Sequence, residues 1–310
     1  MNRMQGLELC EKYYNECGAP MIGDKFPQYE DRIAAGLVGD GSECYGFDDE
    51  ISRDHDWGPG FCLWLDNRDY EEIGRALQEE YEKLPKTFCG YRRKNSDLGG
   101  GRVGVFEIGS FYSRFIGAPK GPETLDQWLY LPENYLSVCT NGMVFFDPLG
   151  EFSQIRERLL DFYPEDVRIL KIAARCMSSA QSGQYNYMRS IRHKEYYAAQ
   201  YSETTFCFDI MSLLFLLNRH YAPFYKWRHR AVRDLPVLGE FLYHKISDIT
   251  NSLDYKEKNN IIEEISRAII KALHDEGLSN SESDFLLDHG PVIQQMIKDE
   301  NLRKRNVWIG

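Results

Sequence analysis

The sequence predicts an α+β fold in two domains, with a mixed sheet and its helices in residues 1–150 and an all-helical domain in residues 151–310. In the first half, short apolar runs are bounded by glycine, proline and aspartate, which is typical of buried strands. In the second half, apolar residues recur at intervals of three and four over long segments, which is the period of an amphipathic helix. The change of period near residue 150 predicts the domain boundary.

The composition indicates a globular protein and disfavours several functions. A chain of 310 residues, of which 43% are hydrophobic, can bury the cores of two domains. The formal net charge of −11 repels nucleic-acid backbones, so binding to bulk nucleic acid is disfavoured. The eight cysteines are scattered without the paired spacing of a zinc site. Because the sequence has no signal pattern and no apolar run of roughly 18 residues, we expect a cytoplasmic protein that does not contact membranes.

Two helices and four strands are expected in the first half. The first helix has Leu7, Cys10 and Tyr14 on one face, and the second is expected to begin at a capping residue, Asp69. The strands are short apolar runs that end in turns or polar loops. The expected helices are 6–16 and 70–83, and the expected strands are 32–38, 54–65 (interrupted at Gly58-Pro59), 103–108 and 143–146.

Six helices are expected in the second half, each with apolar residues at helical spacing. In the longest regular stripe, Ile261, Ile265, Ile269 and Leu273 follow one another at intervals of four residues. The expected helices are 152–162, 166–178, 195–217, 238–252, 255–274 and 284–301.

An Asp-x-Asp pair, Asp54 and Asp56, is the first candidate for a functional site. Side chains alternate between the two faces of a strand, so these carboxylates would share one face and His55 would lie on the other. Two carboxylates side by side repel each other unless a cation neutralises them. The pair therefore predicts a divalent metal site, and Mg²⁺ is the expected ion because it prefers carboxylate and phosphate oxygens.

Two further features are candidates to complete this site. Glu107 is the acidic residue of an otherwise apolar strand, so it can join the pair if the two strands are neighbours. Three carboxylates could then hold two Mg²⁺ ions, which would bridge the attacking and leaving oxygens of an in-line phosphoryl displacement. Gly41 and Ser42 form a turn of small residues, separated from Asp54 by the eleven residues Glu43–Arg53. The main-chain N–H groups of such a turn can hold a phosphate group.

Other interpretations stay open for several of these residues. Glu107 would be solvent-facing if its strand has one exposed face. Asp147 is a rival third carboxylate, although the Pro-Leu-Gly that follows it is typical of a turn. His55 is expected to be a hydrogen-bonded core residue. The acidic run 48–50 is expected to be a solvated loop rather than a second ion site.

Several segments together resemble an uncharacterised bacterial domain family of the DNA-polymerase-beta-like nucleotidyltransferase superfamily. The resemblance extends from about residue 30 to residue 235. It implies that Gly41 and Ser42 contact the triphosphate, and that Asp54, Asp56 and Glu107 bind the metal ions and carry the catalysis. The segments are Gly41–Pro59, Asp126–Leu129, Phe162–Asp166 and Leu217–Trp227.

The resemblance also implies an architecture like that of the aminoglycoside adenylyltransferases, in which a sheet domain and a helical domain enclose the substrates. Basic residues of the second half would then contact the nucleotide, where they stabilise charge on the departing pyrophosphate. Two of them, Arg219 and Lys226, could instead hold helix ends or pair with acidic residues. The candidates are Arg189, Arg192, Arg219 and Lys226.

The function that the resemblance implies is Mg²⁺-dependent transfer of a nucleoside monophosphate. The expected donor is a nucleoside triphosphate, with ATP as the first choice, and the expected acceptor is a small molecule or a protein. One alternative is a catalytically silent nucleotide-binding module with a regulatory or antitoxin-like role. Another is a purely structural partner protein that binds through its aromatic helical face. The tyrosine-rich segment 185–201 is interpreted separately, as a face between the domains.

Overall fold

The structure, a computed structural model, describes residues 4–53, 55–93 and 101–310. The chain divides into two compact units. Unit 1 comprises Met1–Pro122 and Tyr135–Asp161, and unit 2 comprises Glu123–Asn134 and Phe162–Gly310. The division therefore differs from a single boundary at residue 150, because the chain enters unit 2 briefly at residues 123–134 and then returns to unit 1.

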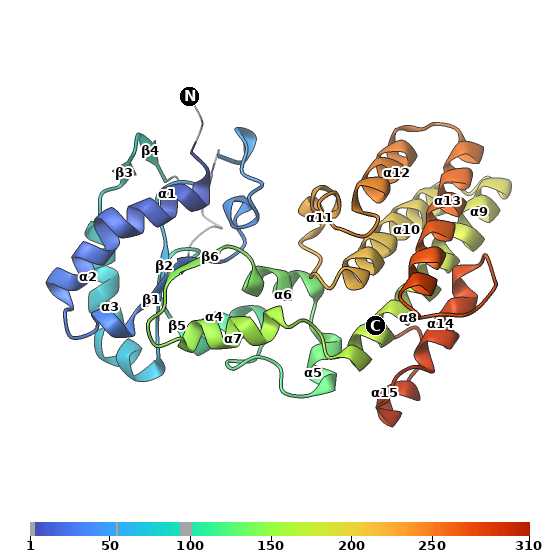
Figure 1. Ribbon diagram of the computed structural model, residues 1–310. Coiled ribbons are helices and arrows are strands. Elements are labelled where there is room, and N and C mark those ends of the chain that lie inside the picture. The colour runs from blue at the N-terminus through green and yellow to red at the C-terminus, as the bar shows by residue number, and fades with distance from the viewer. Residues whose placement is uncertain (1–3, 54, 94–100) are drawn as a thin grey trace. The chain divides into compact units, whose positions relative to one another are not determined.

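A four-stranded sheet in the order β5-β2-β1-β6 forms the centre of unit 1 (Figure 1). β2 and β5 are parallel, whereas β1 is antiparallel to both of its neighbours, β2 and β6. The four strands expected from the apolar runs are thus present, with shorter bounds. They are β1 (Ala34–Leu37), β2 (Cys62–Leu65), β5 (Gly104–Glu107) and β6 (Met143–Phe146), and a separate hairpin consists of β3 (Thr87–Phe88) and β4 (Tyr91–Arg92).

Helices cover both faces of this sheet, which explains why β1 and β2 are apolar at every position rather than at alternate ones. On one face, Leu63 and Leu65 pack in a core with Tyr13 of the first helix. On the other face, the indole of Trp64 is stacked on the ring of Phe152, with centroids 3.8 Å apart. The helices of unit 1 are α1 (Gly6–Tyr13), η1 (Tyr14–Gly18), α2 (Ala19–Lys25), α3 (Asn67–Lys83), α4 (Ile108–Ile116) and α7 (Glu151–Leu160), with short turns η2 (Glu30–Arg32), η3 (Ser42–Tyr45) and η4 (Ile51–Arg53).

Two local expectations for unit 1 are wrong. The strand expected from residue 54 begins only at Cys62, and Asp56 has a left-handed backbone with φ of 53° that no regular strand adopts. The cap of α3 is Asp66, whose carboxylate accepts the N–H of Asp69 at 2.6 Å. The buried carboxylate of Asp69 instead pairs with the guanidinium of Arg32, with Nε–Oδ2 at 2.5 Å and Nη2–Oδ1 at 2.7 Å.

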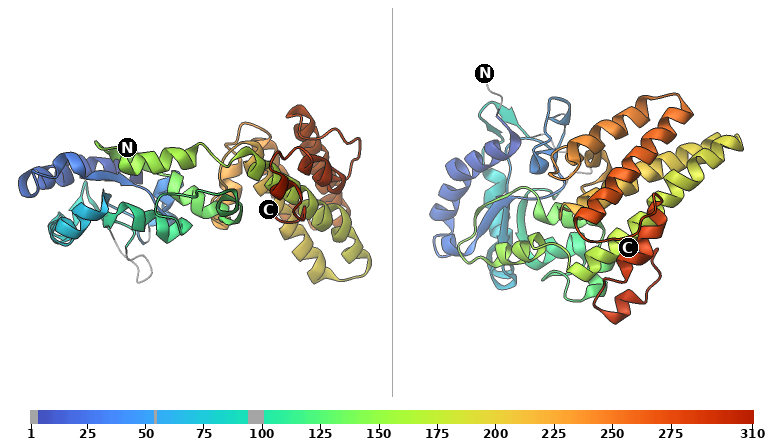
Figure 2. Two further views of the ribbon diagram at one scale, coloured as in Figure 1. Left: turned by 90° about the horizontal axis from the view of Figure 1, so that it is seen from below. Right: turned by 45° about the vertical axis from the view of Figure 1, so that its right-hand side comes forward.

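Unit 2 is helical, as the spacing predicted, and α8 lies at its centre, where it packs against α10 and α14. Figure 2 shows these helices, and α12 beside α13, from two further directions. All six helices expected in the second half are present, the first of them as α7 in unit 1 and the last one in two pieces, α14 and α15. The helices are α5 (Leu125–Tyr130), α6 (Glu133–Thr140, which continues into unit 1), α8 (Glu165–Ser179), η5 (Ala180–Tyr187), α9 (Met188–Arg192), α10 (Tyr196–Leu217), α11 (Tyr225–Val232), α12 (Gly239–Asn251), α13 (Tyr255–Asp275), α14 (Leu286–Gln294) and α15 (Glu300–Arg303).

Two further findings bear on the expectations from composition. All eight cysteines are free thiols, and most of them are buried. Within the described ranges of the chain, no helix has both the length and the apolar character that crossing a membrane requires.

Candidate functional site

The strand directions place the expected phosphate-binding turn and Asp56 at the same end of the sheet. β1 and β2 are antiparallel, with Gly36 opposite Cys62, so the end of β1 lies beside the start of β2. Gly41 and Ser42 follow β1, and Asp56 precedes β2. The sequence separates these residues, but the sheet returns them to one edge.

The Gly41–Ser42 turn opens the short helical turn η3, and Ser42 is buried. The carboxylate of Glu43 folds back onto this turn so closely that a Cβ at position 41 would overlap its oxygens. Gly41 has ordinary extended backbone angles (φ −71°, ψ 147°), so a larger residue at this position would require only that the flexible side chain of Glu43 move aside.

The side chain of Asp48 is buried in the same region, whereas Asp49 and Glu50 are exposed, as expected for the acidic run 48–50. Oδ2 of Asp48 accepts the indole N–H of Trp57 at 3.0 Å and the main-chain N–H of Gly6 at 2.9 Å. A guanidinium nitrogen of Arg53 lies 3.6 Å from the same oxygen. The other carboxylate oxygen of Asp48, Oδ1, is buried and has no hydrogen-bond partner among the described residues.

Asp56 is 3% exposed and is surrounded by cationic or ionisable groups. Its Oδ2 lies 3.1 Å from Nδ1 of His55 and 3.9 Å from a guanidinium nitrogen of Arg102. Its main-chain oxygen accepts a hydrogen bond of 2.9 Å from Arg93. His55 therefore contacts the neighbouring carboxylate and is not a core residue on the opposite face of a strand.

Arg93 and Arg102 interact with acidic residues from both segments at this edge, Glu43 after β1 and Asp56 before β2. Burial raises the pKa of Glu43, and the charge of Asp48 acts in the same direction, whereas Arg93 and Arg102 lower it. The same two arginines contact Asp56. We call this group the edge cluster: Gly41, Ser42, Glu43, Asp48, Arg53, Asp56, Arg93 and Arg102.

The edge cluster does not by itself complete a metal site. The described residues contain no group of three or more His, Cys, Asp or Glu side chains that could hold a metal ion. Asp54, the first member of the expected ligand pair, lies outside the described residues. Asp56 has the chemistry of a Mg²⁺ ligand, but the described side chains around it are mainly guanidinium groups.

Glu107 lies at the other end of the sheet. In the parallel pair of β2 and β5, Glu107 is opposite Leu65, the last residue of β2, whereas Asp56 precedes the first. The carboxylate of Glu107 caps α4 by accepting the N–H of Gly109 at 2.7 Å and that of Ser110. Asp147 also follows a strand at that end and accepts the N–H groups of Gly150 and Ser153. The structure therefore brings neither rival third carboxylate to Asp56.

We expect Glu107→Ala to act on stability and to leave any activity of the edge cluster unchanged. Loss of the cap leaves two N–H groups of α4 without their acceptor, which should lower the free energy of unfolding by about 1 kcal/mol. Chemical denaturation measures this change, and the Glu107→Gln variant, which retains an acceptor oxygen, should lose less. Loss of activity in a folded Glu107→Gln protein would show that Glu107 acts in catalysis after all.

The basic candidates of unit 2 are exposed, and none of them lines the polar pocket around Glu133 and Arg175 in that unit. Arg189 lies over the ring of Tyr185, and the ammonium of Lys226 lies 4.8 Å from the ring centre of Trp227. Arg219 pairs with Glu165 at 2.8 Å, which agrees with the alternative interpretation that this arginine pairs with an acidic residue. Arg192 is exposed near the end of α9.

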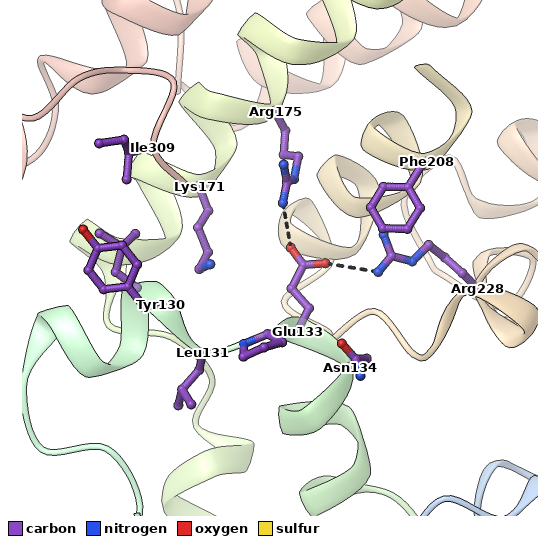
Figure 3. A pocket seen from close by; sticks show the side chains of 12 residues that line it. Tyr130, Leu131, Glu133, Asn134, Lys171, Arg175, Phe208, Arg228 and Ile309 are labelled. Carbon is purple, nitrogen blue, oxygen red and sulfur yellow. Dashed lines mark ion pairs between the residues drawn. The ribbon is translucent and has the colours of Figure 1, made fainter. Parts of the chain in front are cut away.

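A polar pocket that the sequence did not reveal lies within unit 2 and has a volume of about 390 Å³ (Figure 3). Glu133, at the start of α6, lies 4.0 Å from Arg175 of α8 and 3.6 Å from Arg228 of α11. Lys171 lies one helical turn before Arg175 on α8 and also lines the pocket. The sequence signal for this pocket was two cations, Lys171 and Arg175, four residues apart in the otherwise apolar stretch 169–177 of α8.

Comparison with known proteins gives limited matches. The family described as "Domain of unknown function (DUF4037)" matches residues 128–228, a segment that contains the charged residues of the unit 2 pocket. No curated protein matches the chain significantly. Among solved structures, the crystal structure of a nucleotidyltransferase-like protein from Exiguobacterium sibiricum 255-15 is similar, with a TM-score of 0.40 and 11% identity, over 93% of this chain and 81% of that one.

Proposed function

We propose that the chain is a nucleotidyltransferase, which transfers a nucleoside monophosphate from a nucleoside triphosphate to a small-molecule or protein acceptor and releases pyrophosphate. The observation that supports this proposal is that the Gly41–Ser42 turn and Asp56 share one end of the sheet, with Arg93 and Arg102 close to both sides. ATP is the proposed donor.

In this proposal the edge cluster binds the triphosphate. Main-chain N–H groups of the Gly41–Ser42 turn hold a phosphate, for which the Glu43 carboxylate must move away from the turn. Arg93 and Arg102 offset the negative charge of the triphosphate and of the departing pyrophosphate. Mg²⁺ is the proposed cofactor, held by Asp54 and Asp56, and it supplies further positive charge at the phosphates.

The test is to incubate the full chain with Mg²⁺ and each of the four triphosphates, labelled at the α-phosphate, with a panel of hydroxyl-bearing small molecules and of proteins. We expect label transfer and equimolar pyrophosphate release, with ATP preferred and with no transfer in excess chelator. If a folded protein neither binds any triphosphate nor releases pyrophosphate, the proposal is wrong.

One observation favours the alternative of a nucleotide-binding module without turnover. Glu107, the expected third carboxylate, lies at the opposite end of β2 from Asp56, so the described residues do not supply three converging carboxylates. Saturable ATP binding that persists without any pyrophosphate release, across the whole acceptor panel, would support this alternative over the enzyme.

A further inference from the structure

The unit 2 pocket contains a buried cation, Lys171, that has no anionic partner. Lys171 is 4% exposed and forms no hydrogen bond or ion pair with any described residue. Its ammonium lies 5.2 Å from the ring centre of Tyr163. Arg175, by contrast, lies 3.4 Å from Asp209, and Arg228 lies 3.6 Å from Glu133.

Other polar atoms around the pocket also lack partners. Glu133 Oε1 and Arg175 Nε are buried without a hydrogen bond to any described residue. Buried polar atoms in native proteins almost always have a hydrogen-bond partner, so two such atoms beside one cavity indicate a place where a polar ligand binds. Three cations and one side-chain carboxylate line the pocket, and a further carboxylate, that of Asp209, pairs with Arg175.

Mainly apolar residues form the remaining walls, and two of them, Tyr130 and Phe208, are aromatic. Figure 3 shows the side chain of Lys171 between Tyr130 and Ile309 on one side and Glu133 on the other. The ring of Phe208 covers the guanidinium of Arg228, whose central carbon lies 3.9 Å from the ring centre. The volume of about 390 Å³ lies within the roughly 300–1,000 Å³ that small-molecule sites occupy.

We propose that this pocket binds a small molecule through one anionic group, a phosphate or a carboxylate, that pairs with the ammonium of Lys171. Arg175 and Arg228 add positive charge, and an apolar or ring portion of the ligand packs against Tyr130 and Phe208. Nothing in this proposal depends on nucleotidyl transfer, because every residue in it belongs to unit 2.

Protonation offers a readout specific to Lys171. Burial lowers the pKa of its ammonium to about 8, with Arg175 acting in the same direction and Glu133 in the opposite one. An anion bound beside the ammonium favours the charged form and raises this pKa. Binding at pH 8 should therefore take up about half a proton, which calorimetry in buffers of different ionisation enthalpy measures.

The experiment titrates the full chain with inorganic phosphate, phenyl phosphate, benzoate and the neutral analogue benzyl alcohol, each up to 20 mM. Phenyl phosphate, benzoate or both should bind saturably, inorganic phosphate more weakly, and benzyl alcohol not at all. Lys171→Met should weaken binding at least about tenfold and abolish the proton uptake. Lys271→Met, which removes an exposed lysine of α13, should change neither quantity.

A second variant should change the affinity for anions in the opposite direction. Glu133→Gln removes the one carboxylate of the pocket lining with little change in shape, so anion binding should become tighter by about tenfold. If no anion binds the wild-type protein saturably, the proposal is wrong. It is equally wrong if an anion binds Lys171→Met as tightly as the wild-type protein, because that result would place the bound anion elsewhere, for example at the Gly41–Ser42 turn.

Discussion

Asp56→Asn should lower the rate of nucleotidyl transfer on the order of 1000-fold while the protein stays folded. Asparagine has nearly the same shape as aspartate, and it tolerates the left-handed backbone of this position, where φ is 53°. Alanine would add backbone strain to the loss of the carboxylate, so it tests the role of the charge less well. The measurements are pyrophosphate release at saturating ATP and the thermal unfolding midpoint.

The control for Asp56→Asn is Asp24→Asn, which removes a carboxylate that is 70% exposed and pairs with Lys25. Activity should be unchanged in the control, and we expect Asp54→Asn to behave like Asp56→Asn. If Asp56→Asn keeps the wild-type rate, the edge cluster is not the catalytic site. If its unfolding transition collapses, the contacts of Asp56 with His55 and Arg102 are structural.

Lys171→Met should raise the free energy of unfolding at pH 7 by about 3 kcal/mol. Burial lowers the pKa of this ammonium from its usual 10.5 to about 8, and each pKa unit corresponds to about 1.4 kcal/mol. Below pH 8 the lysine is charged in both the folded and the unfolded chain, so the folded state bears the whole penalty of burying the charge. Methionine fills similar space without a charge.

The stability difference between Lys171→Met and the wild-type protein should decrease as the pH rises. Between pH 8 and 10.5 the unfolded chain keeps the Lys171 proton that the folded protein has lost, so the stability of the wild-type protein gains from each rise in pH. The advantage of Lys171→Met should therefore shrink from about 3 kcal/mol at pH 7 to about 1 kcal/mol at pH 10.

Urea denaturation of both proteins from pH 6.5 to 10 measures this difference. Lys271→Met, which removes a lysine that is 75% exposed, should change stability by less than about 0.5 kcal/mol at any pH. A Lys171→Met protein that is less stable than the wild type throughout would show that attraction to Glu133 outweighs the desolvation of the ammonium.

The predictions for Lys171 are connected. A buried cation without a partner destabilises the fold, and such a residue is typical of a site where function sets the choice of side chain. If Lys171 provides anion binding at a cost in stability, the Lys171→Met protein should be more stable than the wild type and should have lost anion binding. A variant that gains stability and keeps binding would leave the buried charge without a functional reason.

Much of the fold could be predicted because it depends on local periodicity. The six helices of the second half and the four strands of the sheet follow the spacing of their apolar residues. The errors arose where a tertiary contact overrides a local signal. Asp69 has the form of a helix cap but pairs with Arg32, and Asp56 has the spacing of a strand residue but lies in a loop that contacts Arg93 and Arg102.

By itself, the sequence determined the six helices of the second half, the four strands of the sheet and the residues of the Gly41–Ser42 turn, because these depend on neighbours along the chain. Only the tertiary structure decided which of the acidic and basic residues share a site. The strand order and direction separate Glu107 from Asp56, and the charges of Asp48 and Arg93 act instead on Glu43. The packing of α6, α8 and α11 places Glu133, Lys171 and Arg228 around one cavity. Charges distant in sequence interact through space, and only the fold sets those distances.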